Sequence, residues 1–429
     1  MNIKVKGGQI LSGEITPSGS KNSAVALIPA SILFDKEILL ENIPDITDVQ
    51  KLTDILMKLG SKITWNKDDR SMLIDNSNLS FEKMQKEDVG TMKGTSLLWG
   101  PMMARFGKVI FDDLPRGCTL GVRPLDPQYK AFRDLGAMVE ENLTSVKMDA
   151  TNARSGEIWL DEMSPTATEN VVMLSTSLPG KTRIIGAASE PQVQDLCEFL
   201  VKCGAKINGI GSSILEVEGG IKLTPKKHRI YPDHYEIATF MAMVAATGGT
   251  LKVNEAMPGK LNNIINVFKK FGLETEYQND AILLRGGQNI NINSDHAGKT
   301  LTVRAQPWPA LPVDLLPIFI PLALSAKTGQ VLFHNWMYEA GLFWTSELTK
   351  LGANIIMADP HRIIVTAGNK LFGTTLEAPY IIRAVVSMVM AAMIAEGESV
   401  ILNADALYRG HPHFSENLRK LGARIEEVS

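Results

Sequence analysis

One pattern recurs along the whole sequence: an amphipathic helix, then a glycine, then a short β-rich segment. The six glycines lie 68 to 80 residues apart, and they are Gly60, Gly136, Gly204, Gly272, Gly352 and Gly422. A glycine suits this place because it can adopt the left-handed backbone that ends a helix. Chance does not readily produce six copies at similar spacing, and the spacing is too long for the common solenoids. The sequence therefore predicts six related units.

A strongly apolar helix and a β-rich segment precede each copy, as in Asn22–Leu33 followed by Glu37–Leu40. Helices this apolar are buried. Later segments such as Ser71–Asp75 read as strands bounded by turns. Each unit is thus a helix, a strand, an amphipathic helix and two strands, with the apolar helices inside and the sheets and amphipathic helices as an outer wall. Because 429 residues exceed what one core supports, we expect three units in each of two domains.

Charge and cysteine content narrow the class of protein. The net charge of −3 provides no overall basic field for nucleic acid or an anionic membrane, so an anionic ligand needs a few placed cations. The most apolar stretch, Ile381–Ala395, contains Arg383 and is too short to span a bilayer. Three cysteines do not read as a disulfide framework. We expect a cytoplasmic monomer or weak oligomer that binds neither nucleic acid nor membrane.

Two cations lie at the predicted starts of apolar helices, Lys21 in the first unit and Arg383 in the sixth. Helix starts present free N–H groups and the positive end of the helix dipole, so they favour anions. Simple N-capping explains Ser164 and Asp314 at equivalent places. It does not explain a cation, which is locally unfavourable there. Lys21 and Arg383 therefore indicate a site for phosphate and carboxylate groups.

A glycine-rich loop from Arg116 to Asp126 contains Cys118, five residues before Arg123. A nearby cation lowers the pKa of a thiol, so we expect Cys118 to be reactive. Cys197 and Cys203 lie on an amphipathic helix and are expected to be inert core residues. His411 and His413 lack a third ligand and are weak evidence for a metal, so neither a metal nor a cofactor is expected.

At these motifs the sequence resembles the enolpyruvyl transferase family, and within it the UDP-N-acetylglucosamine 1-carboxyvinyltransferases, over nearly the whole chain. It is similar, more distantly, to 5-enolpyruvylshikimate-3-phosphate synthase. The resemblance implies two inside-out α/β domains, each of three βαβαββ repeats, joined by a double hinge. Residues 21–230 would form one domain with the cysteine loop, and residues 1–20 and 231–429 would form the other.

The resemblance also implies an activity: transfer of the enolpyruvyl group of phosphoenolpyruvate to a hydroxyl of the nucleotide sugar UDP-N-acetylglucosamine, with release of phosphate, in peptidoglycan precursor synthesis. Cys118 matches the acid of the family and Asp314 its proposed base, while Lys21 and Arg409 match residues that hold phosphoenolpyruvate. Glu190 and Glu236 match interdomain positions. The implied substrate-binding residues are Lys21, Asn22, Lys93, Arg123, Pro124, Leu125, Asp126, Ser164, Thr166, Asp233, Arg383 and Arg409.

The departures from the family pattern gather on the acceptor side and at closure contacts. Lys93 and His234 each replace an Arg, Gln128 a His, Glu162 a Lys, Pro165–Thr166 a Val–Gly pair, Gly341 an Arg and Ile381 an Asp. Two alternatives therefore stay open: an enolpyruvyl transferase with a different nucleotide or phosphorylated acceptor, and a non-catalytic paralogue that binds a nucleotide sugar.

Overall fold

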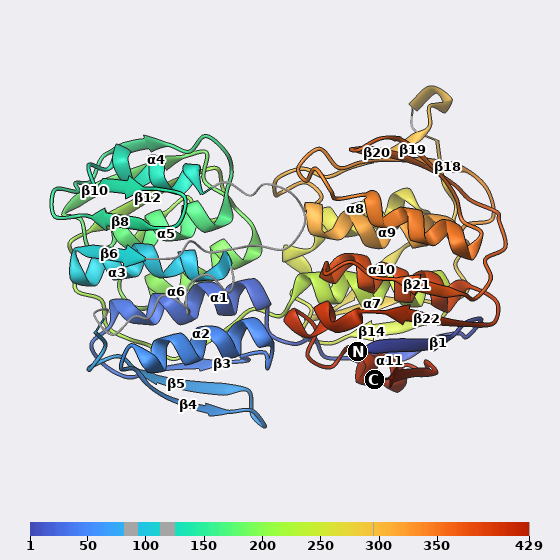
Figure 1. Cartoon of the computed structure of the whole chain (residues 1–429), viewed down its shortest axis with the longest axis horizontal. Coiled ribbons are helices and arrows are strands. Elements are labelled where there is room, and N and C mark those ends of the chain that lie inside the picture. Colours follow the sequence, from blue (N-terminus) through green and yellow to red (C-terminus); the bar gives the residue numbers. More distant parts are fainter. Residues whose placement is uncertain (81–92, 112–124, 295, 429) are drawn as a thin grey trace. The chain divides into compact units, whose positions relative to one another are not determined.

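A computed structural model describes residues 1–80, 93–111, 125–294 and 296–428 of the chain. These residues form two compact units. The terminal unit contains Met1–Ser18 and Pro232–Ser429, and the middle unit contains the described residues from Gly19 to Tyr231. The chain enters the middle unit between Ser18 and Gly19 and leaves it between Tyr231 and Pro232 (Figure 1).

The middle unit consists of three repeats of helices and strands. The first has α1 (Lys21–Ala30), η1 (Ser31–Leu33), β3 (Ile38–Glu41), α2 (Thr47–Lys58), β4 (Lys62–Asn66) and β5 (Ser71–Asp75). The second has η4 (Lys93–Leu98), α3 (Trp99–Phe106), β6 (Lys108–Phe111), α4 (Asp126–Asp134), β7 (Met138–Glu141) and β8 (Val146–Asp149). The third has β9 (Glu157–Trp159), α5 (Pro165–Ser175), β10 (Gly180–Ile185), α6 (Pro191–Lys202), β11 (Lys206–Asn208) and β12 (Ile214–Gly219), and β13 (His228–Arg229) follows it.

The terminal unit has the same plan, preceded by β1 (Asn2–Lys6). The fourth repeat has β2 (Gly13–Ile15), α7 (His234–Thr247), β14 (Leu251–Val253), η5 (Pro258–Lys260), α8 (Asn262–Lys270), β15 (Thr275–Gln278) and β16 (Ala281–Leu284), and η6 (His296–Gly298) follows it. The fifth has β17 (Leu301–Arg304), η7 (Val313–Leu315), α9 (Leu316–Leu324), β18 (Gln330–His334), η8 (Phe343–Leu351), β19 (Asn354–Asp359) and β20 (Arg362–Thr366). The sixth has β21 (Thr375–Glu377), α10 (Ile382–Ile394), β22 (Glu398–Leu402), η9 (Ala404–Arg409), α11 (Phe414–Lys420) and β23 (Ile425–Val428).

Each repeat forms its own small sheet, and the strand order is the same throughout. Orders such as β9-β10-β12-β11, β17-β18-β20-β19 and β2-β14-β16-β15 place a parallel strand at one edge and an antiparallel ladder beyond it. In the second sheet the described strands are β6, β8 and β7. The six-repeat prediction and the βαβαββ plan are both confirmed.

Two sheets are completed by strands from a distant part of the chain. β1 lies between β22 and β23 and supplies the sixth repeat with the strand that otherwise comes from within the repeat. β13 pairs with β3 and supplies the parallel edge strand of the first sheet. The N-terminal strands therefore belong with the last repeats of the chain, and the end of the middle unit belongs with its beginning.

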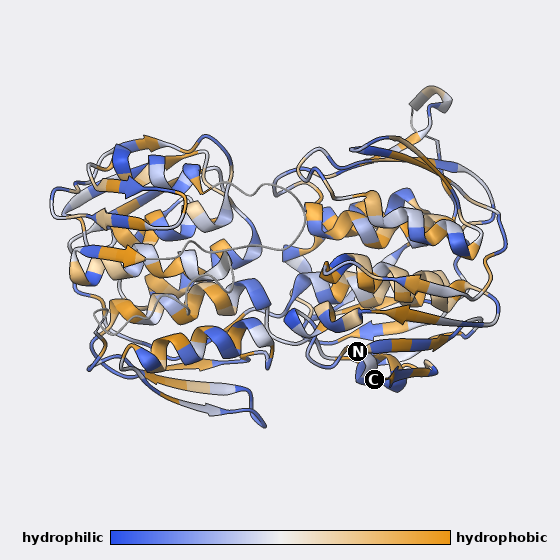
Figure 2. Ribbon diagram, viewed as in Figure 1, coloured by the Kyte–Doolittle hydropathy of each residue, from blue (hydrophilic) through white to orange (hydrophobic). Residues whose placement is uncertain are grey.

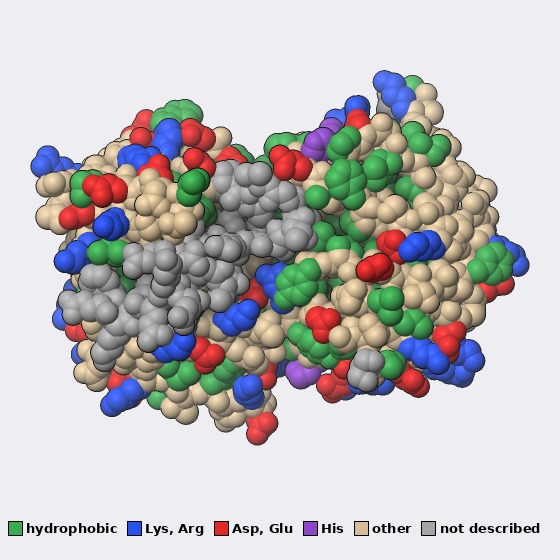
Figure 3. Space-filling model, in the orientation of Figure 1, with side chains coloured by type: hydrophobic (Ala, Val, Ile, Leu, Met, Phe, Trp, Pro, Cys, Tyr) green, Lys and Arg blue, Asp and Glu red, His purple; other side chains and the backbone are tan. Residues whose placement is uncertain are grey.

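The apolar helices form the centre of each unit, as predicted. In the terminal unit α7, α9 and α10 pack against one another, and their interior residues are almost fully buried (Figures 1 and 2). In the middle unit α3 packs on α5, and α1 packs on η4 and α6. Charged side chains of both signs are interspersed over the outer surface (Figure 3). No helix among the described residues has both the length and the apolar character needed to cross a membrane.

The six repeat glycines all have positive φ, between 74° and 110°. This confirms the prediction that each ends a helix with left-handed backbone. The amphipathic helix of the fifth repeat differs from expectation because η8 is a 3-10 helix rather than an α-helix. The hydroxyls of Thr345, Ser346 and Thr349 each donate to the carbonyl three residues back, which suits the tighter turn.

The glycine at a helix end can be tested without changing any contact. Gly204 has a φ of 105°, and a Cβ there would meet nothing within 4 Å. Gly156 of the same unit has equally open space but no positive φ. We expect Gly204→Ala to lower the free energy of unfolding by about 1–2 kcal/mol, and Gly156→Ala to change it by less than about 0.5 kcal/mol. Calorimetric unfolding of both variants measures this, and equal effects would contradict a backbone cause.

Candidate functional site

Lys21 is the first residue of α1, and its charge has a buried partner in the next helix. Its Nζ lies 2.7 Å from Oδ2 of Asp48, in the first turn of α2. Ser20 caps α1 by accepting a hydrogen bond from the Ser23 N–H. The buried Asp48 carboxylate thus offsets the unfavourable position of a cation at a helix start. The Lys21 side chain as a whole stays one-fifth exposed.

Asn22 and Lys93, which are also predicted to bind substrate, lie at helix starts as well. Asn22 is the second residue of α1 and is half-buried. Lys93 is the first residue of η4, which runs directly into α3. The second apolar helix therefore begins as a 3-10 turn, and its α-helical part starts later than the sequence pattern indicated.

The start of α5 holds Ser164 and Thr166. Ser164 caps the helix by accepting from the Ala167 N–H. Thr168 donates its hydroxyl to the Ser164 carbonyl at 2.9 Å and accepts the Ala188 N–H at 2.9 Å, which ties this helix start to the segment after β10. Glu162 is exposed, and its carbonyl accepts from the Ser164 N–H. Capping and a ligand-binding role are thus compatible at Ser164.

The predicted cysteine loop is only partly described. Cys118, Arg123 and Pro124 lie outside the described residues, so their roles stay predictions. Leu125 packs against the core of the middle unit, and Asp126 is exposed at the first position of α4.

In the terminal unit, Asp233 caps α7. Its Oδ1 accepts from the N–H groups of Tyr235 at 2.8 Å and Glu236 at 3.0 Å. Glu236 is buried, and its Oε2 accepts from the Ser18 N–H at 3.0 Å. Burial, and then the negative charge of Asp233, raise the pKa of Glu236 to about 7. Asp233 therefore has a structural role in addition to the substrate contact predicted for it.

His234, the first residue of α7, is 1% exposed, and neither ring nitrogen has a hydrogen-bond partner among the described residues. Its ring packs against Tyr235 and meets the edge of Trp308. Its pKa is lowered to about 4, chiefly by burial and also by the charge of Arg383, while the charges of Asp233 and Asp314 oppose the shift. At the position where the resemblance implies an arginine, this chain therefore holds a neutral ring at ordinary pH.

Asp314 lies inside η7, ahead of α9, and is half-buried. From the sequence alone, Asp314 is explained as an N-cap of this helix, and that explanation is wrong. The cap of η7 is Pro312 and the cap of α9 is Leu315, and neither makes a side-chain capping bond. The chemical role predicted for Asp314 stays a prediction.

Arg383 and Arg409 both rest on aromatic rings. Arg383, in the first turn of α10, donates from Nη1 to Nε2 of the buried His411 at 2.7 Å, and its guanidinium lies 4.9 Å from the centre of the Tyr235 ring. Arg409 ends η9 and lies 5.4 Å from the ring of Tyr380. The contact of each guanidinium with a ring helps to orient the cation.

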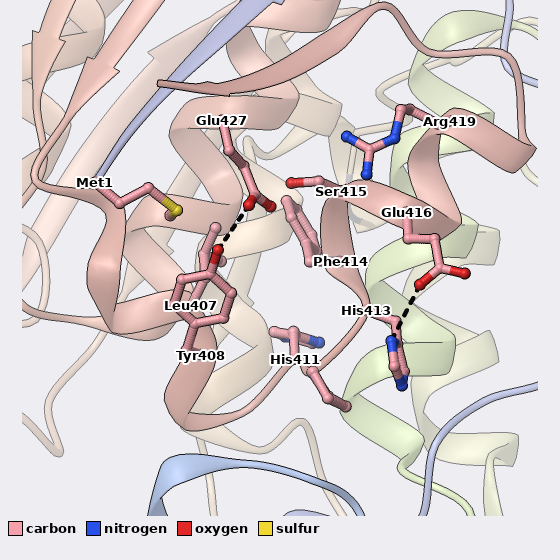
Figure 4. Close-up of a pocket in the computed structure, with 11 residues that line it drawn as sticks. Met1, Leu407, Tyr408, His411, His413, Phe414, Ser415, Glu416, Arg419 and Glu427 are labelled. Atoms are coloured by element: carbon pink, nitrogen blue, oxygen red, sulfur yellow. Dashed lines mark hydrogen bonds and ion pairs between the residues drawn. The ribbon is translucent and has the colours of Figure 1, made fainter. Parts of the chain in front are cut away.

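His411 belongs to a structural support rather than a metal site. It also lines a pocket of about 200 Å³ next to Tyr408, Phe414 and Arg419 (Figure 4). His413 is exposed and pairs instead with Glu416. Over the described ranges, no group of three or more His, Cys, Asp or Glu side chains is placed to hold a metal ion.

Cys197 and Cys203 are buried free thiols, as predicted for core residues. Burial raises the pKa of Cys197, and it raises that of Cys203 to about 11.

Sequence reasoning missed the partners of three predicted residues: Asp48 beside Lys21, Tyr235 beside Arg383 and Tyr380 beside Arg409. Nothing in the sequence indicated that His411 bonds to Arg383 or that Gln128 bonds to Thr166. The aspartate in the first turn of α2 carried no signal of its own, because acidic residues are common at that place in any helix.

Comparison with known proteins decides the family. The family model for EPSP synthase (3-phosphoshikimate 1-carboxyvinyltransferase) matches residues 5–418. A UDP-N-acetylglucosamine 1-carboxyvinyltransferase of Borreliella burgdorferi is 36% identical over 99% of this chain and 98% of its own length. That of Treponema denticola is 37% identical over 98% of both. The chain belongs to the enolpyruvyl transferase family.

The enolpyruvyl transferase fold is shared with solved structures of low sequence identity. The enolpyruvyl transferase NikO from Streptomyces tendae aligns with a TM-score of 0.85 at 20% identity over 99% of this chain and 98% of its own. EPSP synthase from Acinetobacter baumannii aligns with a TM-score of 0.75 at 15% identity, covering 99% and 100%. This protein is thus an enzyme of the family, with the fold that the sequence implied.

Glu236 should make the stability of this enolpyruvyl transferase depend on pH. Its folded pKa of about 7 exceeds the ordinary value of 4.5, so its contribution is fully present below pH 4.5 and is lost as pH rises through 7. We expect Glu236→Gln to be more stable than the parent at pH 8, by at most ~3 kcal/mol, and the advantage to vanish below pH 4.5. Urea unfolding across pH measures the difference.

The exposed Glu37 provides the control. Glu37→Gln should show a flat difference from the parent over the same range. A flat difference for Glu236→Gln as well would show that the buried carboxyl does not titrate in this range.

Proposed function

We propose that this enolpyruvyl transferase moves the enolpyruvyl group of phosphoenolpyruvate onto a hydroxyl of UDP-N-acetylglucosamine, with release of inorganic phosphate. The observation that carries the proposal is full-length identity of 36–37% to enzymes with that name. The positions of three cations support phosphoenolpyruvate as the donor substrate. Lys21 of the middle unit and Arg383 and Arg409 of the terminal unit each contact a neighbouring side chain at or near a helix end.

The chemistry proceeds by addition and elimination. The acceptor oxygen bonds to C2 of phosphoenolpyruvate while C3 takes up a proton, giving a tetrahedral intermediate. Loss of a proton from C3 then restores the double bond as phosphate leaves C2. Asp314 is the proposed base for the acceptor hydroxyl, and Cys118 is the proposed acid at C3. Lys21, Arg383 and Arg409 stabilise the negative charge of the donor as it shifts.

Lys93 and Arg123 are further proposed substrate contacts. The residues proposed to bind the acceptor are Asn22, Pro124, Leu125, Asp126, Ser164 and Thr166. The two compact units are proposed to be the functional domains. The role is proposed to be peptidoglycan precursor synthesis, as the resemblance implies. The cell location is proposed to be the cytoplasm, because Cys197 and Cys203 are unpaired buried thiols of the kind kept in a reducing compartment.

The non-catalytic alternative rested on Gly341 and Ile381. A Cβ at Gly341 would lie 2.2 Å from Nδ2 of the buried Asn335, so this chain has closed the space that a larger side chain needs. Ile381 is 9% exposed and precedes α10. Both positions are buried in this chain, and the charged residues of the proposed chemistry are present.

Phosphate release from phosphoenolpyruvate tests the function. We expect turnover with UDP-N-acetylglucosamine and none with shikimate 3-phosphate. Asp314→Asn should lower kcat by about 10²–10⁴-fold with little change in the KM for phosphoenolpyruvate, because a base acts in the transition state. Lys21→Met should instead raise that KM. Phosphate release with shikimate 3-phosphate alone, or none with any acceptor, would refute the proposal.

The proposed acid can be tested by chemical labelling. Fosfomycin, an epoxide that resembles phosphoenolpyruvate, should add once per chain, at Cys118. Cys197 and Cys203 are internal controls, because their burial and raised pKa keep them as unreactive thiols. Peptide mass spectrometry locates the adduct. An active enzyme that is labelled at Cys197 or Cys203, or not at all, would move the acid role away from Cys118.

A further inference from the structure

A buried chain of hydrogen bonds lies behind the start of α5 in the middle unit. It runs from the backbone of Gly100 through the side chains of Asn170 and Gln128 to the hydroxyl of Thr166. α3 and α5 touch at this point, since a Cβ on Gly100 would lie 2.3 Å from the Asn170 carbonyl oxygen. Gln128 is 2% exposed and Asn170 is fully buried, so both amides face inward.

The backbone allows only one orientation of the Asn170 amide. Its Oδ1 accepts from the Gly100 N–H at 2.7 Å, and its Nδ2 donates to the carbonyls of Ser96 and Thr166, each at 3.0 Å. A backbone N–H can only donate and a carbonyl can only accept. Rotating this amide by half a turn would place like groups together at all three contacts.

Asn170 in turn orients Gln128. Oε1 of Gln128 lies 3.1 Å from Nδ2 of Asn170, which has two hydrogens for this oxygen and the two carbonyls and therefore shares one of them. Because the opposite orientation would place two NH₂ groups against each other, the other side of the Gln128 amide is its NH₂ group. That Nε2 donates to Oγ1 of Thr166 at 3.1 Å. The backbone groups at the start of α3 therefore determine the orientation of both amides, and with it the group that Gln128 presents to Thr166 in the first turn of α5.

The hydroxyl of Thr166 is consequently an acceptor toward Gln128, and its own hydrogen points elsewhere. Its Oγ1 lies 3.4 Å from Oγ of Ser164, a long hydrogen bond in which either hydroxyl could donate. Thr166 is half-buried in the first turn of α5, where a helix start favours anions. Pro165 has no N–H to offer there, so the Thr166 hydroxyl adds a donor at a helix start that lacks one.

We propose that Gln128 and Asn170 are positioning residues that hold the Thr166 hydroxyl as a hydrogen-bond donor to an anionic oxygen of the acceptor nucleotide. The inference rests on the proposed function and deepens it. Gln128, Pro165 and Thr166 then act as one set: the proline removes a backbone donor, the threonine supplies a side-chain donor, and the glutamine sets its direction.

Two nearly isosteric changes test this directly. Thr166→Val removes the hydroxyl and keeps the shape. Gln128→Glu places a carboxylate oxygen against Thr166, so the hydroxyl must donate to it and is lost to the ligand. We expect each to raise the KM and calorimetric Kd for UDP-N-acetylglucosamine by about tenfold or more, the effect of one hydrogen bond to a charged group. The KM for phosphoenolpyruvate should change by less than about twofold.

A variant that combines Gln128→Glu with Thr166→Val separates a positioning role of Gln128 from a direct effect of the added charge on nucleotide binding. Because Gln128 acts through Thr166, Gln128→Glu should add little in the Thr166→Val background. Lys130→Gln is the matched control, since it makes the same change of charge on the exposed side of α4 and should leave nucleotide affinity unchanged. Thr166→Ser should keep most of the affinity because it retains the hydroxyl.

Each outcome decides a different point. An equal loss from Gln128→Glu with and without Thr166 would show a direct charge effect and overturn the positioning role. Unchanged nucleotide affinity in Thr166→Val would overturn the donor role, even if Gln128→Glu does not fold. If the parent enzyme uses another nucleotide, the acceptor assignment fails, and the KM of Thr166→Val for that nucleotide still tests the donor.

Discussion

A helix that is apolar on every side has to be covered on every side, and this constraint shapes both units. The small sheet and amphipathic helix of one repeat cover only part of such a helix. In the terminal unit α7, α9 and α10 therefore cover one another at the centre, and the sheets close around them. The same need explains why β1 and β13 return to complete distant sheets, since an uncovered edge would leave core side chains and backbone groups exposed.

In the buried central helices, polar and charged side chains lie mainly at the helix ends. Interior positions are filled by side chains such as Phe240, Phe319 and Val386, so polar groups can be placed where each helix starts and free N–H groups need partners. Ser20, Ser164 and Asp233 meet that need as caps. Lys21, Arg383 and Asp314 do not, and these are the residues that the proposed chemistry uses.

The residues around these charges determine how they behave. Asp48 compensates Lys21, while His411 and Tyr235 hold Arg383 without removing its charge. The neutral, buried His234 beside Asp233 and Asp314 replaces a cation of the family pattern. In the middle unit, Gln128 and Thr166 are joined by a hydrogen bond within a buried network.

The six repeats could be derived from the sequence because their signals are local. Each glycine can end a helix because its backbone can adopt positive φ, and the apolar composition of each central helix indicates that the helix is buried. The cations were also found locally, because Lys21 and Arg383 break the rule for helix starts. The resemblance supplied the chemistry of Asp314 and Arg409, and the roles of Cys118, Arg123 and Pro124 stay predictions. Tertiary structure alone decided which side chains support them. Asp48, Asn170 and His411 come from other helices or loops, and their hydrogen bonds form only when packing brings together residues far apart in sequence.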